Sequence, residues 1–137
     1  MKNAGNEIFA YWIMKVRIQG NSLRFRLKQP EVAALKENDQ ITEEICFGEA
    51  PAESLRFVLA CGNGPAFSIH YMPGNFTAMV PREVMRHWTE SEQTGIEEDV
   101  MLPSGRNIHL LIEKDFKCLN GTDKENSGTF PNPMEAC

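Results

Sequence analysis

The stretch MKVRIQGNSLRFRLK, residues 14–28, decides the fold that this sequence predicts. Apolar and polar side chains alternate on both sides of Gly20 and Asn21, which is the pattern of two strands with one buried face each. A two-residue turn that begins with glycine is typical of a type II′ hairpin. That turn sets Ile18 opposite Leu23, so all the apolar side chains of the hairpin are expected on one side.

The other side of this hairpin is basic. Its five cations are Lys15, Arg17, Arg24, Arg26 and Lys28. The pairing sets like charges opposite one another, and such pairs repel unless something neutralises them. Phosphates, an acidic partner, a second subunit or the chain's own acids could do so, and the internal candidates are Glu43, Glu44 and the acidic run within residues 90–99. Because the net charge is -5, internal or subunit neutralisation is favoured over phosphate.

The remaining pattern predicts an α+β domain with a mainly antiparallel sheet of about seven strands and two short helices. Proline opens both helical patterns, at residues 30–38 and 81–88. Strand patterns cover residues 41–48, 54–61, 66–72, 75–80 and 107–116. Residues 89–105 are expected to form a loop. The strands are expected to follow one another as a meander, either open or closed into a barrel.

The length suits one domain, and 42% hydrophobic with 24% charged residues is ordinary for a globular chain. We assign residues 14–119 to the domain, 1–13 to an N-terminal extension and 120–137 to an irregular tail. Met14 is a candidate for the true start, because the regular pattern begins there.

Two internal echoes make a duplication an option. SLRFRL at residues 22–27 is similar to SLRFVL at residues 54–59. In addition, a strand runs into proline and then into a helix containing Glu-Val at two places, near Pro30 and near Pro81.

No run of about twenty apolar residues could span a bilayer. The N-terminal apolar segment IFAYWIM is followed by charged residues and lacks the small residues of a signal cleavage site. We therefore expect a cytoplasmic protein without membrane contact, in which the four cysteines are mostly reduced.

The thiols and imidazoles offer one candidate metal group. Alternation places Cys61 in the core, whereas Cys46, His70 and His109 are expected on the face away from it. These three could bind a metal only if their strands are neighbours. Otherwise each is an ordinary solvated strand position.

A second candidate metal group lies at the C-terminus, where Cys118 and Cys137 frame a stretch rich in glycine, asparagine and proline. Zinc or another metal would need two more ligands, from Asp115, Asp123 or the histidines, and the close C-x-x-C spacing is missing. One hypothesis is that the tail is ordered against the core with its thiols metal-bound or paired. The alternative is that FPNP packs across the sheet or stays loose, with Cys137 a thiol without function.

The sequence contains no G-x-S-x-G, P-loop or H-E-x-x-H motif, so nothing favours an enzyme. The motifs MKVRIQGNSLRFRL, VPREVMRHW, EKDFKCL and FPNPMEAC instead resemble a family of short bacterial proteins of unknown function. The resemblance covers Met14 to Cys137 and implies a bacterial, cytoplasmic, single-domain protein without an assigned activity. In that family histidine is usual at the position of Cys46, which keeps a ligand role open there.

The chain also resembles, over a shorter stretch, the swapped-hairpin DNA-binding domains of antitoxins and transition-state regulators. In these a strand ends in proline and runs into a short helix, as FTAMVPREVM does. This resemblance implies that the basic hairpin residues meet DNA. They would be Lys15, Arg17, Arg24 and Arg26.

The sequence thus predicts a non-enzymatic binding or accessory protein whose basic hairpin face meets an acidic partner or its own subunit. A nucleic-acid-binding protein of the swapped-hairpin type and a Cys/His metal-binding protein are the alternatives.

Overall fold

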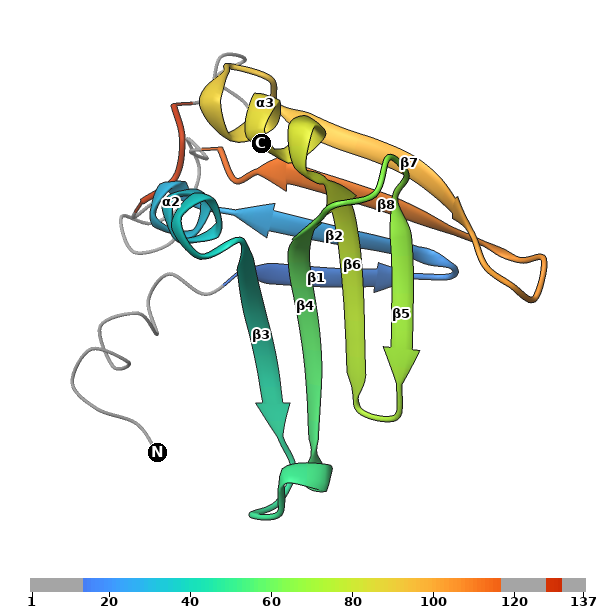
Figure 1. Ribbon diagram of the computed structural model, residues 1–137. Coiled ribbons are helices and arrows are strands. Elements are labelled where there is room, and N and C mark those ends of the chain that lie inside the picture. The colour runs from blue at the N-terminus through green and yellow to red at the C-terminus, as the bar shows by residue number, and fades with distance from the viewer. Residues whose placement is uncertain (1–13, 117–127, 132–137) are drawn as a thin grey trace.

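The computed structural model describes residues 14–116 and 128–131. This part of the chain forms eight strands and two α-helices, with the strands arranged in two four-stranded mixed sheets (Figure 1). The predicted α+β class is confirmed. The predicted single sheet is wrong, and the two sheets do not close into a barrel within these residues.

Sheet A has the strand order β1-β2-β8-β7. Its members are β1 (Lys15–Gln19), β2 (Ser22–Leu27), β7 (Gly95–Met101) and β8 (Asn107–Lys114). The predicted hairpin register is confirmed, since Ile18 pairs with Leu23. Gly20 has a φ of 59° whereas Asn21 does not have a positive φ, as a type II′ turn requires.

Sheet B has the order β3-β4-β6-β5. Its members are β3 (Gln40–Cys46), β4 (Ser54–Gly62), β5 (Ser68–Met72) and β6 (Asn75–Pro81), and the short 3-10 helix η2 (Pro51–Glu53) joins β3 to β4. The expected antiparallel meander is wrong, because β4 pairs in parallel with β6 and β2 in parallel with β8. Each hairpin pairs with the other hairpin of its sheet through its second strand. Alternation within a strand does not indicate which other strand becomes its neighbour.

Strand β7 was expected to be a loop. Three consecutive acids, residues 97–99, interrupt the alternation that identifies a strand. In the structure this segment pairs antiparallel with β8, and Ile96 and Val100 point into the core. Pairing with a buried neighbour therefore outweighs the low strand preference of the acids.

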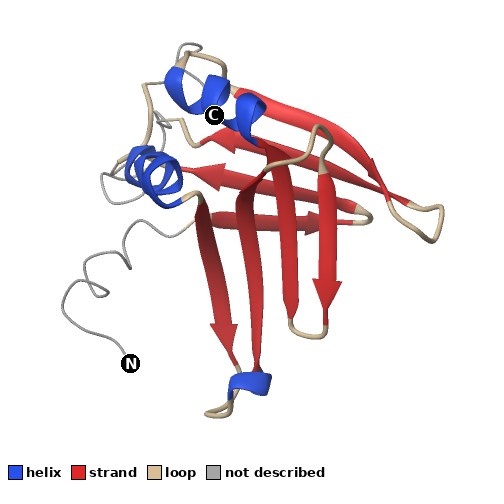
Figure 2. Ribbon diagram, in the orientation of Figure 1, coloured by secondary structure: helices blue, strands red, loops and turns tan. Residues whose placement is uncertain are grey.

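Both α-helices, α2 (Gln29–Asn38) and α3 (Arg82–Glu90), lie at one corner of the sheet pair (Figure 2). They contact each other there. Helix α2 ends at Asp39, whose φ of 65° allows its N–H to donate to the Leu35 carbonyl at 2.8 Å. Leu35 of α2 and Met85 and Trp88 of α3 are the large side chains that the two helices bury completely. None of the described helices is long and apolar enough to cross a membrane.

The core lies between the sheets, whose strands cross one another in Figure 1. Sheet A contributes Phe25 and Ile112 and sheet B contributes Leu59 and Val80, all fully buried. The alternate side chains of each strand therefore form an outer face on each sheet, and neither of the two described α-helices packs on these outer faces.

The described strands divide into two halves of identical order, hairpin, helix, hairpin. The first half is β1-β2-α2-β3-β4 and the second is β5-β6-α3-β7-β8. Each half gives one hairpin to each sheet. At the centre of each sheet, the second strands of its two hairpins pair in parallel, β2 with β8 and β4 with β6. The strand-proline-helix echo falls on equivalent places, after β2 and after β6. The SLRF echo falls on β2 and β4, which are not equivalent.

Two glycines of positive φ provide a test of the hairpin geometry. A Cβ on Gly20 would meet nothing within 4 Å, whereas a Cβ on Gly74 would lie 2.9 Å from the Ser54 carbonyl oxygen. We expect Gly20→Ala to lower the free energy of unfolding by about 1–2 kcal/mol through backbone strain alone. Gly74→Ala should lower the free energy of unfolding clearly more, because it adds a clash with the Ser54 carbonyl oxygen. Urea denaturation of both variants measures the difference, and equal losses would contradict these geometries.

Candidate functional site

Four of the five predicted cations share the outer face of sheet A. They are Lys15 and Arg17 on β1 and Arg24 and Arg26 on β2, and we call them the basic strip. Lys28 does not belong to it, because that residue is only 7% exposed at the start of α2. Its backbone N–H donates to Oε1 of Glu31 at 2.7 Å, so its place is fixed by the helix cap.

Two carboxylates of β8 and the residue after it lie against the basic strip. Oε1 of Glu113 is 3.1 Å from Nε of Arg26 and 3.4 Å from Nε of Arg24. Nζ of Lys15 lies 2.9 Å from Oδ2 of the buried Asp115. Among the residues that the structure describes, Arg17 has no carboxylate partner, so four cations face two acids.

The internal acids expected from the sequence lie elsewhere. Glu44 pairs with Arg56 at 2.9 Å on the outer face of sheet B. The acids of residues 97–99 lie on β7, at the opposite edge of sheet A from β1. Glu113 is not recognisable from the sequence as a partner of the strip, because the parallel pairing that sets it beside Arg26 joins strands far apart in the chain. Local alternation could have placed Glu113 on an outer face, but not next to a particular strand.

The β7 edge of the same face is acidic. Oε2 of Glu97 and Oδ1 of Asp99 lie 2.6 and 2.7 Å from the two ring nitrogens of His109 on β8. The two carboxylates raise the pKa of His109, because a ring that donates to both must be protonated on both nitrogens. The outer face of sheet A is therefore basic along β1 and β2 and acidic along β7.

A group of buried acids lies where β2, β8 and α2 meet. Glu31 is 2% exposed, and burial raises its pKa to about 7, with Asp115 and Glu43 adding to the rise. Glu43, on the inner face of β3, also has its pKa raised by burial to about 7. Oε2 of Glu31 and Oε1 of Glu43 accept no hydrogen bond from any described residue. Burial of these oxygens thus favours the neutral form of both carboxyls.

The predicted Cys/His metal group is not assembled. Cys46 and His70 both lie on the outer face of sheet B, as expected, but on the two opposite edge strands β3 and β5. His109 lies on sheet A. The strands are not neighbours, which was the condition for this group, and within residues 14–116 and 128–131 no three His, Cys, Asp or Glu side chains are arranged so that they could hold a metal ion.

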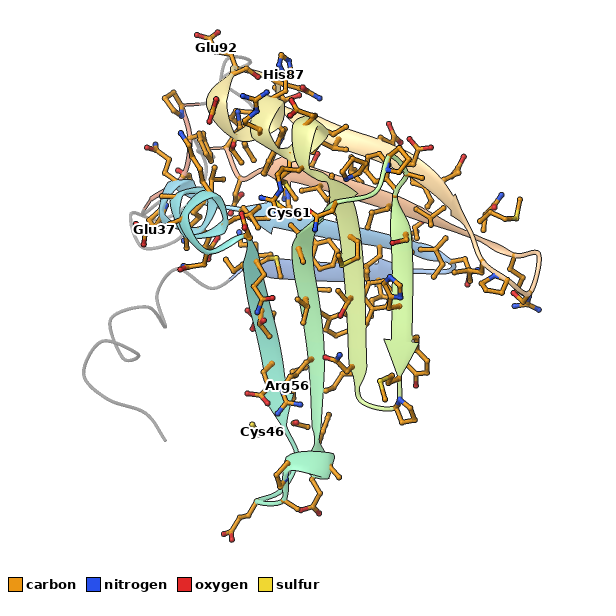
Figure 3. All side chains as sticks on the ribbon, in the orientation of Figure 1. Glu37, Cys46, Arg56, Cys61, His87 and Glu92 are labelled. Atoms are coloured by element: carbon orange, nitrogen blue, oxygen red, sulfur yellow. The ribbon has the colours of Figure 1, made fainter. Side chains whose placement is uncertain are left out.

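Cys61 lies at the far end of sheet B from Cys46 (Figure 3). It packs against the core as predicted, and burial raises the pKa of its thiol. Both cysteines are free. Cys46 and Cys61 are too far apart to act together, and the raised pKa of the Cys61 thiol disfavours its reactive thiolate form.

The second predicted metal group, Cys118 and Cys137 with Asp123, lies outside the described residues. Of the expected tail, residues 128–131 are described. The Phe130 N–H donates to the Asp115 carbonyl at 2.9 Å, and the Gln29 N–H donates to the Gly128 carbonyl at 2.9 Å. The Phe130 ring packs at 6.0 Å from Phe116, so this part of the tail lies against the ends of β2 and β8.

A shallow polar hollow of ≈ 370 Å³ lies on the exposed side of α3 and includes His87 and Arg86. Arg86 is already bonded to Glu83 one turn away. The hollow contains no nucleophile held by a base, so it offers no recognisable catalytic arrangement within the described chain.

The fold and its faces define a small α+β protein with two interlocked halves and one sheet face divided by charge. The chain belongs to a family of unknown function (DUF7009), whose model matches residues 14–134. The resemblance to a family without an assigned activity is thereby confirmed. The curated proteins contain no match to this sequence.

The buried carboxyl of Glu43 predicts how stability depends on pH. Its pKa rises from 4.5 to about 7 on folding, so the folded state holds the proton more tightly and folding becomes more favourable as the pH falls through this window. Glu43→Gln removes the charge at constant shape. We expect it to raise the free energy of unfolding at about pH 8 by roughly 1–2 kcal/mol.

Urea denaturation between about pH 8 and pH 5 measures this effect. Glu44→Gln is the matched control, because it removes a neighbouring carboxyl that is exposed and paired with Arg56. It should bring no gain at high pH. A Glu43→Gln variant that is less stable than the parent at that pH would contradict a buried carboxyl without a partner.

Proposed function

We propose that this protein is a non-enzymatic binding module whose basic strip docks an acidic segment of a partner protein. The observation that carries the proposal is the imbalance on the outer face of sheet A, where four cations share two carboxylates. Arg17 is exposed and faces no acid in the described chain, and Glu113 is shared by two guanidinium groups.

The geometry of the strip suits a charged partner. The register sets Arg17 opposite Arg24 and Lys15 opposite Arg26, so the cations stand in two facing pairs on the hairpin. Like charges held this close repel, and an added carboxylate relieves the repulsion. Guanidinium groups also bind carboxylates with two parallel hydrogen bonds, which gives direction as well as attraction.

An acidic partner is favoured over polyanions because the chain is acidic overall. A net charge of -5 repels nucleic acid at long range, whereas a short acidic segment interacts with the strip alone. The attraction should therefore be local and sensitive to salt, since the Debye length is about 8 Å at physiological ionic strength.

A labelled peptide of glutamate, serine and glycine tests this function by fluorescence anisotropy. We expect binding that weakens with added salt, and a loss of roughly threefold to fivefold in affinity for Arg17→Gln at low ionic strength. The matched control is Arg106→Gln, which removes an exposed arginine from the β7–β8 loop. Equal binding by both variants would contradict a role for the strip.

A nucleic-acid-binding function is the second candidate, and one observation favours it. The two halves exchange hairpins between the sheets, and a strand runs through proline into a helix in both. This is the arrangement implied by the resemblance to swapped-hairpin DNA-binding domains. The basic strip would then contact phosphates, as a two-stranded ribbon can.

Electrophoretic shift and anisotropy with duplex DNA and single-stranded RNA at low salt test this second function. If it holds, the logarithm of the binding constant falls linearly with the logarithm of the salt concentration, and Arg24→Ala or Arg26→Ala makes the slope shallower by about one phosphate. A protein that ignores both nucleic acids at low salt does not have this function.

A further inference from the structure

The free edge of β1 presents backbone hydrogen-bonding groups. His109 N–H donates to the Asn21 carbonyl and Asp115 N–H to the Leu27 carbonyl, so the odd-numbered residues of β2 bond to β8. The even-numbered residues of β2 therefore bond to β1. In an antiparallel pair the alternate residues of the partner point away, and these are Val16 and Ile18. No described strand pairs with that side of β1.

Beyond this edge, the described residues leave part of the inner face of sheet B exposed. Strands β3 to β6 run on past β1 in Figure 1, and the pairing register assigns their lower apolar side chains to the same face as the core residue Phe57. These side chains are Ile45, Leu55, Tyr71 and Phe76, which we call the overhang. Tyr71 is 69% exposed and Ile45 is 50% exposed. Ile18, at the edge itself, is 62% exposed.

We propose that a partner strand, alternating apolar and acidic side chains, adds to the free edge of β1 and covers the overhang. This inference rests on the proposed function and specifies how the acidic segment is held. A strand at this edge extends sheet A over the uncovered part of sheet B. Its inward side chains then pack on the overhang, and its outward side chains lie beside Lys15 and Arg17.

Three features of the edge select this occupant. The backbone groups of Val16 and Ile18 supply the main-chain bonds of strand addition. The apolar overhang requires apolar side chains at every second position, since an added strand follows the same alternation. The cations of β1 require acids at the positions between.

The same charges disfavour a second copy paired through its own β1. A two-fold antiparallel pairing about Arg17 would set that guanidinium opposite its equivalent in the other copy. Cations on an edge strand commonly prevent such self-pairing. Its charges thus favour an acidic strand over a second copy at the edge of β1.

The experiment compares two short peptides, acetylated and amidated, with the length and composition matched. In one, glutamate alternates with valine, and in the other the same residues are scrambled. We expect the alternating peptide to bind at least about tenfold more tightly. It should also slow amide hydrogen exchange at Val16 and Ile18, which binding to side chains alone would not do.

Two changes test the backbone contact itself. Ile18→Pro removes an outward N–H that the hairpin does not use, and Ile18→Val retains it. We expect the proline variant to lose the preference for the alternating peptide and the valine variant to keep it. A peptide methylated on the amide nitrogens that face β1 should lose the preference with the unaltered protein, so the test does not depend on the proline variant folding.

The outcomes separate this inference from the proposed function. If both peptides bind equally and both depend on Arg17, the basic strip binds acids but strand addition is wrong. If neither peptide binds, the proposed function fails as well. Sedimentation that shows a dimer of the parent protein, lost in Ile18→Pro, would assign the edge to a second copy and overturn the inference.

Discussion

Parallel pairing between the inner strands is the constraint on which the whole structure depends. Strands β2 and β8, and likewise β4 and β6, belong to opposite halves of the chain. Each half alone contains two hairpins and a helix, but no complete sheet and no complete core. The hydrogen bonds between these central strands bring four hairpins into two sheets. The buried side chains of both sheets, such as Phe25 and Leu59, can pack only once this pairing exists.

The same pairing determines the chemistry of the faces. Because β2 and β8 are neighbours, Glu113 lies beside Arg26 and reduces the charge of the basic strip without cancelling it. Because β7 lies beyond β8 in the sheet, the acids around His109 occupy the edge opposite β1. One sheet face thus carries both signs of charge, separated by its central strands. The overhang also follows from the arrangement of the sheets, since the strands of sheet B extend beyond β1, the edge strand of sheet A.

Local patterns in the sequence were sufficient for most elements but not for their arrangement. The hairpin at Gly20, its register and the outward direction of four of its five cations follow from alternation and turn chemistry, and the structure agrees, whereas Lys28 is buried. Strand β7 is not recognisable in the sequence, because its consecutive acids obscure the alternation. Pairing with β8 overrides the low strand preference of these acids. The parallel pairs, the partner of Arg26 and the separation of Cys46 from His109 depend on contacts between distant segments. No single segment of sequence contains that information.

The interlocked halves also bear on how the chain reaches its native state. The first hairpin finds its sheet partner only when residue 110 is available to pair with residue 23, so most of the polypeptide must be synthesised before sheet A can form. Contacts of such long sequence separation slow folding, because the chain loses the entropy of closing a large loop before these contacts can stabilise it. A nascent chain at the ribosome would hold an unfinished sheet until its last strand emerges, and that interval is when it is most exposed to misassembly.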